Sequence, residues 1–167
     1  MLIRVEEPRD RAAIHAVNVS AFETPAEANL VDALRERAQP FVSLIAEDSG
    51  VIVGQIALSP VGLADHPELQ IMGLAPMAVA PEHQRKGIGS ALVRAGLEQC
   101  KRLGFGAVVV LGHPAYYPRF GFMSSAHFGI ACEYEVPEDV FMVVELQPGF
   151  LRGASGKVKY HAAFGDV

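Results

Sequence analysis

The chain has 167 residues, 50% of them hydrophobic, so its length suits one domain, residues 1–167, with a full-sized core. Its formal net charge of −5 argues against non-specific nucleic-acid binding, which needs a basic face, and mildly favours a cationic or neutral substrate. The N-terminus lacks the basic region and apolar run of a signal peptide, and no segment is long and apolar enough to span a membrane. We therefore expect a cytoplasmic protein that binds neither nucleic acid nor a membrane.

The residues that most often bind metals are scattered along the chain. Cys100 and Cys132 are the only cysteines, and neither they nor the six histidines have metal-ligand spacing. We expect two reduced thiols and no bound metal.

The N-terminal part predicts a strand, two helices and a hairpin. Leu2–Glu6 alternates between apolar and polar residues, as a half-buried strand does. Asp10 is suited to cap the helix that follows it, and Pro25 suits the first turn of the second helix. Asp48-Ser49-Gly50 is a hairpin signal between two strand-like runs. The expected elements are helices Arg11–Ala21 and Pro25–Arg37, and strands Phe41–Glu47 and Val51–Pro60.

The centre of the chain predicts a strand, a helix and a buried strand. We expect Val61–Leu69 to be an irregular link and Leu69–Val79 to be a strand, which Pro76 places at a sheet edge or at a bulge. Ala107–Leu111 is a β-branched run typical of a strand that is buried on both faces. A helix between the two strands, Gln84–Leu103, implies a right-handed parallel crossover. Its expected core stripe is Ile88, Ala91, Leu92, Ala95, Gln99 and Leu103.

The C-terminal part predicts three further strands after an aromatic turn. The turn spans Gly112–Phe122, and a loop spans Pro148–Gly156. The expected strands are Ile130–Glu135, Val140–Leu146 and Val158–Tyr160.

The start of the central helix has the features of a phosphate site, here named the cradle, residues Gln84–Ser90. Two glycines, Gly87 and Gly89, let the backbone approach a ligand closely, and the first N–H groups of a helix have no intrahelical acceptor. The positive end of the helix dipole and the side chains of Arg85 and Lys86 favour an anion at the same place. We interpret the cradle as a binding site for pyrophosphate.

Two common nucleotide motifs are excluded by the spacing in this region. A dinucleotide-binding fold needs Gly-x-Gly-x-x-Gly and an acidic residue about 20 positions further on. Here Leu92 stands at the third glycine position, and Gly106–Leu111 has no carboxylate. A P-loop needs a lysine after its second glycine, whereas Lys86 precedes Gly87.

The pattern Gln84-x-x-Gly87-x-Gly89 resembles the acyl-CoA signature, Gln/Arg-x-x-Gly-x-Gly/Ala, of the GNAT superfamily of N-acetyltransferases. Further along, Tyr117-Pro118-Arg119-Phe120-Gly121-Phe122 is similar to the Tyr-x-x-x-Gly-Phe element of that family. The resemblance implies an α/β (α+β) fold, with a mixed central β-sheet, a splayed and bulged strand, and flanking helices. Pro76 falls where this fold opens a cleft for the pantetheine arm of CoA.

The resemblance also implies roles for residues around that cleft. The cradle would bind the pyrophosphate through the N–H groups of Arg85, Lys86, Gly87, Ile88, Gly89 and Ser90. The strand end, Met77, Ala78 and Val79, would hold the pantetheine through main-chain hydrogen bonds. Tyr117, four positions before Gly121, would donate a proton to the leaving thiolate. The alternative is that Tyr117 has only a structural role, as an aromatic residue of the core.

The sequence defines the proton acceptor less sharply. Glu27 lies on the predicted second helix, which borders the acceptor site in this family, although an exposed helix glutamate is usually only solvated. Many family members have an asparagine near the position of His113 that binds CoA. His113 either takes the place of that asparagine or only shapes the loop. Tyr116 either lines the acceptor pocket or packs in the core, and Arg119 either packs or pairs with a carboxylate.

The resemblance implies an acetyl-CoA-dependent N-acetyltransferase that acts on a primary amine by direct attack in a ternary complex. The absence of cysteine from both motifs argues against an acyl-enzyme intermediate. The alternative is a GNAT-fold protein that binds acyl-CoA as a sensor without turnover. Small molecules and peptides remain open as the amine acceptor, and the sequence does not decide whether the C-terminal strands form a homodimer.

Overall fold

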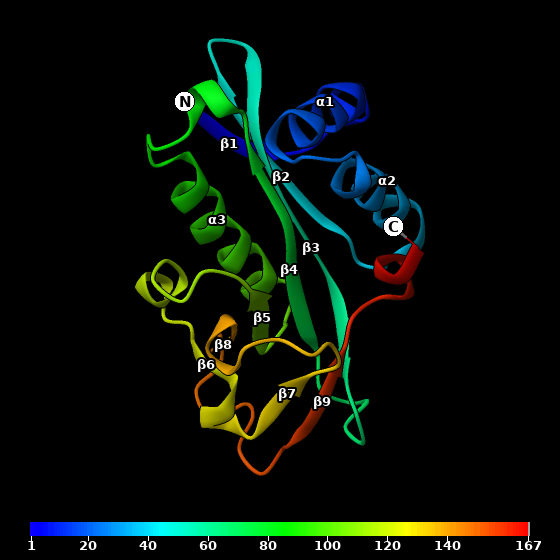
Figure 1. Cartoon of the computed structure of the whole chain (residues 1–167), viewed down its shortest axis with the longest axis vertical. Helices are drawn as coiled ribbons and strands as arrows, with labels where there is room; N and C mark the ends of the chain where they lie inside the picture. Colours follow the sequence, from blue (N-terminus) through cyan, green and yellow to red (C-terminus); the bar gives the residue numbers. More distant parts are fainter. Residues whose placement is uncertain (167) are drawn as a thin grey trace.

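The structure, a computed structural model, describes residues 1–166. Within these residues, nine strands form one connected sheet (Figure 1). The strands are β1 Leu2–Val5, β2 Val42–Asp48, β3 Val51–Leu63, β4 Ile71–Val79, β5 Ala107–Leu111, β6 Met123–Ser124, β7 Ile130–Cys132, β8 Phe141–Glu145 and β9 Gly156–Lys159. The helices are α1 Arg11–Ala21, α2 Ala26–Arg37 and α3 Ile88–Arg102. Short 3-10 turns span Pro8–Asp10, Pro81–His83, Tyr117–Phe120, Ser125–Phe128, Glu138–Val140 and Ala162–Asp166.

The main sheet has the order β1-β2-β3-β4-β5-β8-β6, and β9 pairs with both β3 and β7. Only β4–β5 and β7–β9 are parallel among the paired strands of residues 1–166. The chain passes from β4 through α3 to the parallel strand β5, which confirms that the predicted crossover is parallel.

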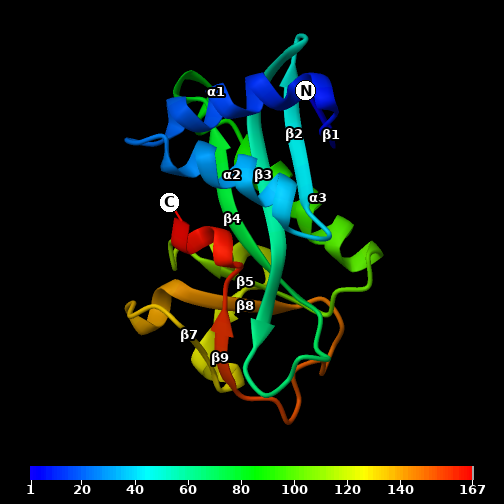
Figure 2. The same ribbon diagram turned by 90° about the vertical axis from the view of Figure 1, so that its right-hand side faces the viewer.

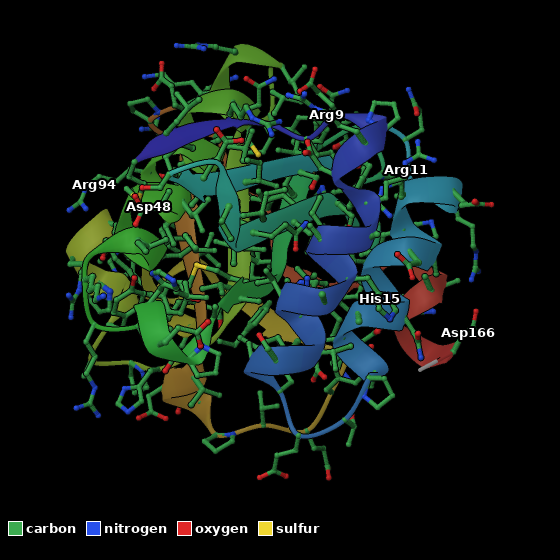
Figure 3. The ribbon with its side chains drawn as sticks, turned by 90° about the horizontal axis from the view of Figure 1, so that it is seen from above. Arg9, Arg11, His15, Asp48, Arg94 and Asp166 are labelled. Atoms are coloured by element: carbon green, nitrogen blue, oxygen red, sulfur yellow. The ribbon has the colours of Figure 1, made fainter. Side chains whose placement is uncertain are left out.

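Helices cover both faces of the sheet. The helices α1 and α2 cross one face, with the C-terminal turn below them, and α3 lies on the other face (Figure 2). Ile14 of α1 and Val31 of α2 pack on Ala57 of β3. On the other face, Leu92 and Cys100 of α3 belong to the largest cluster of buried side chains. Seen from above, His15 of α1 and Arg94 of α3 lie on opposite sides (Figure 3).

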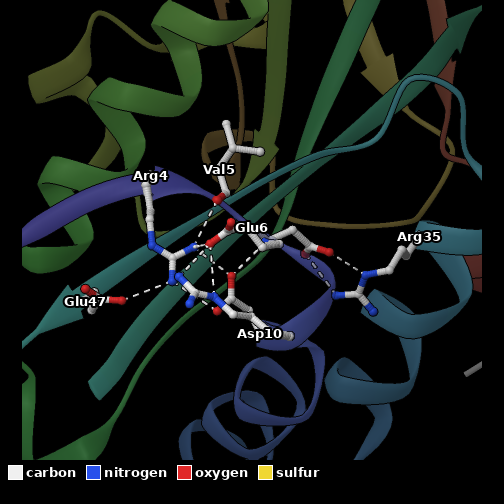
Figure 4. A network of polar contacts seen from close by, with 8 residues as sticks. Arg4, Val5, Glu6, Asp10, Arg35 and Glu47 are labelled. Carbon is white, nitrogen blue, oxygen red and sulfur yellow. Dashed lines mark hydrogen bonds and ion pairs between the residues drawn. The ribbon is translucent and has the colours of Figure 1, made fainter. Parts of the chain in front are cut away.

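A polar network joins β1 and the turn that follows it to β2 and α2 (Figure 4). The guanidinium of Arg4 donates to Asp10 at 2.7 and 3.0 Å and to Glu47 at 3.0 Å. Arg35 of α2 donates to Glu6 at 2.6 and 2.9 Å. The Arg4 guanidinium beside Asp10 lowers the pKa of that carboxyl from 3.8 to about 2.

Strand β4 is bulged and splayed in its second half. Where β4 pairs with β3, the register shifts: Leu74 faces Leu58, and Met77 faces Ile56. Ala75 and Pro76 therefore lie opposite the single residue between Ile56 and Leu58, which is a β-bulge. On its other side, within residues 1–166, β4 pairs with β5 only from Ile71 to Leu74. The last residues of β4 therefore present a free edge beside β5.

Most predicted elements are confirmed, but β7 ends at Cys132 rather than Glu135, β6 was not predicted, and three further corrections follow. The helix after β4 begins at Ile88 rather than Gln84. Its core face comprises Ile88, Leu92, Val93, Gly96 and Cys100, whereas Leu103, expected in the core stripe, is 45% exposed. The segment Val61–Leu63 is the end of β3 rather than an irregular link, because β9 pairs with Gly62 and Leu63. The mixed sheet with a bulged, splayed strand agrees with the fold that the motifs imply. No helix in residues 1–166 is long and apolar enough to cross a membrane.

Candidate active site

The backbone before α3 forms a loop that turns twice through the left-handed region. The φ angles are 64° at Arg85 and 84° at Gly87. The side chain of Gln84 holds this loop against β4, because its Nε2 donates to the backbone oxygen of Val79 at 3.0 Å. The N–H of Ala91 donates to the carbonyl of Gly87. The N–H groups of residues 88–90 thus precede the helical ladder and are free to bind an anion.

A cavity of about 430 Å³ opens over this helix start. Much of the predicted cradle lines it, together with the end of β4. The predicted residues in its walls are Val79, Gln84, Arg85, Gly87, Ile88, Gly89 and Ser90. A Cβ placed on Gly87 would meet no heavy atom of the described residues within 4 Å, so the cavity is open at this point. A space of this size with convergent N–H groups suits a phosphate-bearing ligand.

Three residues that the sequence did not assign to the cradle also line the cavity: His83, Tyr116 and Arg119. The hydroxyl groups of Tyr116 and Ser90 are hydrogen-bonded at 3.0 Å. The guanidinium of Arg119 lies 4.4 Å from the centre of the Tyr116 ring, and its Nε donates to the Tyr116 carbonyl. Arg119 thus adds a second cation beside Arg85. The Tyr-x-x-x-Gly-Phe motif was the available signal, but it does not indicate which of two adjacent tyrosines faces the helix start.

Tyr117 is buried and lies outside that cavity. Its side chain is 8% exposed, and the ring packs edge-on against Phe122 at 5.6 Å. A Cβ on Gly112 would lie 2.2 Å from the Tyr117 ring, so the glycine permits this close packing. Burial raises the pKa of Tyr117 to about 12, which keeps the phenol protonated at neutral pH.

Glu27 occupies the core-facing stripe of α2. It precedes the buried residues Leu30, Val31 and Leu34 at helical spacing, and its own side chain is partly buried. Its Oε1 atom is buried and has no hydrogen-bond partner in the described part of the chain. The structure therefore does not place Glu27 on a solvated helix face. A buried carboxylate oxygen without a partner is costly and is available to a ligand.

Four further residues predicted to bind CoA are not in the walls of the cavity. Met77 and Ala78 are on the splayed part of β4. Lys86 is exposed. His113 is exposed, and its Nδ1 accepts a hydrogen bond from the N–H of Ala115 at 3.2 Å, so its observed contact shapes the turn after β5.

Cys100 and Cys132 are free and buried. No group of three or more His, Cys, Asp or Glu in residues 1–166 is placed to hold a metal.

Comparison with known proteins identifies the family. The sequence profile described as the acetyltransferase (GNAT) family matches residues 7–122. The chain belongs to the GNAT family. A relative, the uncharacterized N-acetyltransferase YhbS of Escherichia coli (strain K12), is 41% identical over 165 residues and covers 98% of both chains.

Solved GNAT structures also share the fold. The crystal structure of Escherichia coli YhbS in complex with CoA has a TM-score of 0.92 at 40% identity, covering 98% of this chain and 91% of that chain. A GNAT acetyltransferase from Brucella melitensis in complex with acetyl-CoA has a TM-score of 0.80 at 36% identity, covering 98% and 97%. GNAT relatives of this chain thus bind CoA or acetyl-CoA.

Proposed function

We propose that this GNAT protein transfers the acetyl group of acetyl-CoA to a primary amine by direct attack in a ternary complex. The observation that carries the proposal is the free edge of β4, which ends at the cavity over the start of α3. A free strand edge offers unpaired N–H and C=O groups, and the helix start offers anion-binding N–H groups. The two together suit a ligand with an amide-bearing arm and a pyrophosphate.

In this proposal, the cradle binds the pyrophosphate of acetyl-CoA. The N–H groups from Arg85 to Ser90 and the side chains of Arg85 and Arg119 supply positive charge there. Met77, Ala78 and Val79 hold the pantetheine arm through the edge of β4, and a strand N–H polarises the thioester carbonyl. In this proposal His113, two residues after the end of β5, contacts the arm.

The chemistry requires one proton to leave the ammonium and one to reach the sulfur. We assign Glu27 as the base, because its buried Oε1 has no partner in the described residues. We assign Tyr117 as the donor to the thiolate. A phenol with a pKa of about 12 is a weaker acid than an ordinary thiol, whose pKa is about 8.5. We therefore expect Tyr117 to donate a hydrogen bond that stabilises the thiolate as the C–S bond breaks, and the thiolate then to take up its proton from solvent.

A pair of glycine substitutions at the two ends of α3 tests the cradle. Gly87→Asp adds a carboxylate where φ is 84° and where the new Cβ has no heavy atom of residues 1–166 within 4 Å. Gly104→Asp makes the same change at the other end, where φ is 90° and the space is also open. We expect Gly87→Asp to weaken acetyl-CoA binding at least about tenfold by charge repulsion, whereas Gly104→Asp leaves binding nearly unchanged.

Calorimetric titration of the folded variants gives the two affinities. Equal acetyl-CoA affinity in both variants would remove the cradle from the proposal. Release of the CoA thiol with a panel of amines then tests turnover itself.

A further inference from the structure

A second cavity, of about 390 Å³, lies beside the cavity over the start of α3. This cavity, here named the α3 groove, lies between residues 94–101 of α3 and the turn Tyr117–Phe120. Arg119 lines both cavities, so the two are neighbours on one side of the helix. The helix residues of the first cavity end at Ser90, and those of the α3 groove begin at Arg94. A ligand bound at the cradle can therefore extend into the α3 groove.

The α3 groove has an apolar floor. Leu97 of α3, Phe120 of the turn and Leu146 after β8 belong to its walls. All three side chains pack against the largest core cluster but are only partly buried, so part of each is open to a ligand. Covering apolar area is worth about 25 cal/mol per Å². The floor therefore suits a flat heterocyclic base.

Two guanidinium groups of the α3 groove lie over aromatic rings. That of Arg94 is 4.9 Å from the centre of the Phe120 ring, and that of Arg119 is 4.4 Å from the centre of the Tyr116 ring. The two rings contact each other edge-on, with centres 5.3 Å apart. This aromatic pair holds both cations at the end of the groove nearest the cradle. A guanidinium stacked on a ring keeps N–H donors at its edge for an anion.

The unpaired charge of the α3 groove is positive. Within residues 1–166, its three cations, Arg94, Lys101 and Arg119, form no ion pair. Its two carboxylates do have contacts: Glu98 pairs with an arginine one turn further along α3 at 3.7 Å, and Glu145 accepts a hydrogen bond from a backbone N–H at 2.8 Å. The groove therefore favours an anion, although the chain as a whole has a net charge of −5.

We propose that the α3 groove binds the 3′-phosphoadenosine end of acetyl-CoA, with Arg94 and Arg119 donating hydrogen bonds to the 3′-phosphate. This inference rests on the proposed binding of acetyl-CoA at the cradle. One ribose separates the 3′-phosphate of CoA from its pyrophosphate, and Ser90 and Arg94 are about 6 Å apart along the helix axis. The base covers the apolar floor. The groove thereby selects the free coenzyme over an acyl-pantetheine on a carrier protein, which lacks the 3′-phosphate.

Acetyl-CoA and 3′-dephospho-acetyl-CoA test the proposal, because they differ only in the 3′-phosphate. In calorimetric titrations, we expect the intact protein to bind acetyl-CoA at least about tenfold more tightly. Arg94→Gln should remove most of this difference by weakening acetyl-CoA binding, while the affinity for 3′-dephospho-acetyl-CoA stays nearly unchanged. Arg94→Lys keeps the charge and should keep most of the preference, which separates phosphate binding from packing on Phe120.

Arg11→Gln is the matched control. It removes the same charge from an exposed residue of α1, which lies on the other side of the molecule from Arg94 (Figure 3). Both affinities should be those of the intact protein. Equal affinity of the intact protein for the two ligands, or an equal loss for both in Arg94→Gln, would overturn the inference and leave the proposed function standing.

The same titrations separate this inference from the proposed function. A preference for the 3′-phosphate that depends on Arg94, without thiol release from any amine, would support the α3 groove and contradict the transferase. Binding of neither ligand would contradict both.

Discussion

The two adjacent tyrosines after β5 have different surroundings and should have different roles. Tyr117 is buried against Gly112 and Phe122, whereas Tyr116 reaches Ser90 at the start of α3. We expect Tyr117→Phe to lower kcat by about 100-fold or more while acetyl-CoA affinity hardly changes, because only the donor to the sulfur is lost. Thiol release and calorimetry measure the two quantities.

Tyr116→Phe is the matched control for that experiment, and we expect it to keep most of kcat. A catalytic rate in Tyr117→Phe equal to that of the unaltered protein would exclude the tyrosine from the reaction. A protein that binds acetyl-CoA but never releases thiol with any amine would be the sensor rather than the enzyme.

The hydrogen bond between Ser90 and Tyr116 should stabilise the fold at the cradle. Its oxygens are 3.0 Å apart and the contact is partly buried. We expect Ser90→Ala and Tyr116→Phe each to lower the free energy of unfolding by about 1 kcal/mol. Because both remove the same bond, the double variant should lose less than the sum, which a urea-denaturation cycle detects. Fully additive losses would show that the two hydroxyl groups do not interact in solution.

The attachment of β1 to α1 should depend on pH through Asp10. Its folded pKa of about 2 is below the ordinary value, so its ionised form stabilises the fold. This stability is fully present above about pH 4 and is lost as the pH falls towards 2. We expect Asp10→Asn to be less stable at neutral pH and to show a flatter decline of unfolding free energy between these values.

The exposed pair between Arg37 and Asp166, at 2.6 Å, provides the comparison. Asp166→Asn should change stability little, since exposed pairs contribute about 1 kcal/mol or less. If Asp10→Asn follows the same acid profile as the unaltered protein, the Arg4 contact does not control acid stability.

The order of the elements could be predicted from the sequence because its signals are local. The alternation of apolar and polar residues predicted β1, and the run of β-branched residues predicted β5. Pro76 predicted the bulge of β4. Long-range contacts account for the errors. The end of β3 is a strand because β9 pairs with it, and no residue within Val61–Leu63 carries that information. The helix start was misplaced because Arg85 adopts a left-handed conformation that non-glycine residues rarely show.

The candidate site was predictable where a motif fixes the backbone. Except for Lys86, the residues from Gln84 to Ser90 line one cavity. The glycine pattern had indicated a ligand site at these residues. The contributions of Tyr116 and Arg119 depend on how the turn at Tyr117–Phe120 folds over α3, and the motif does not specify this. A further cavity, beneath the β7–β8 loop, combines residues of β7, of that loop and of the turn Ser125–Phe128, and it had no sequence signal of its own.

Across the whole molecule, the central claim is that the splayed sheet and the cradle together bind acetyl-CoA. Calorimetric titration of the purified protein with acetyl-CoA, alongside NAD and ATP, tests it most directly. We predict micromolar binding of acetyl-CoA and no comparable binding of NAD or ATP, because the glycine pattern fits neither nucleotide fold. Absence of acetyl-CoA binding, or equal binding of all three ligands, would contradict the account.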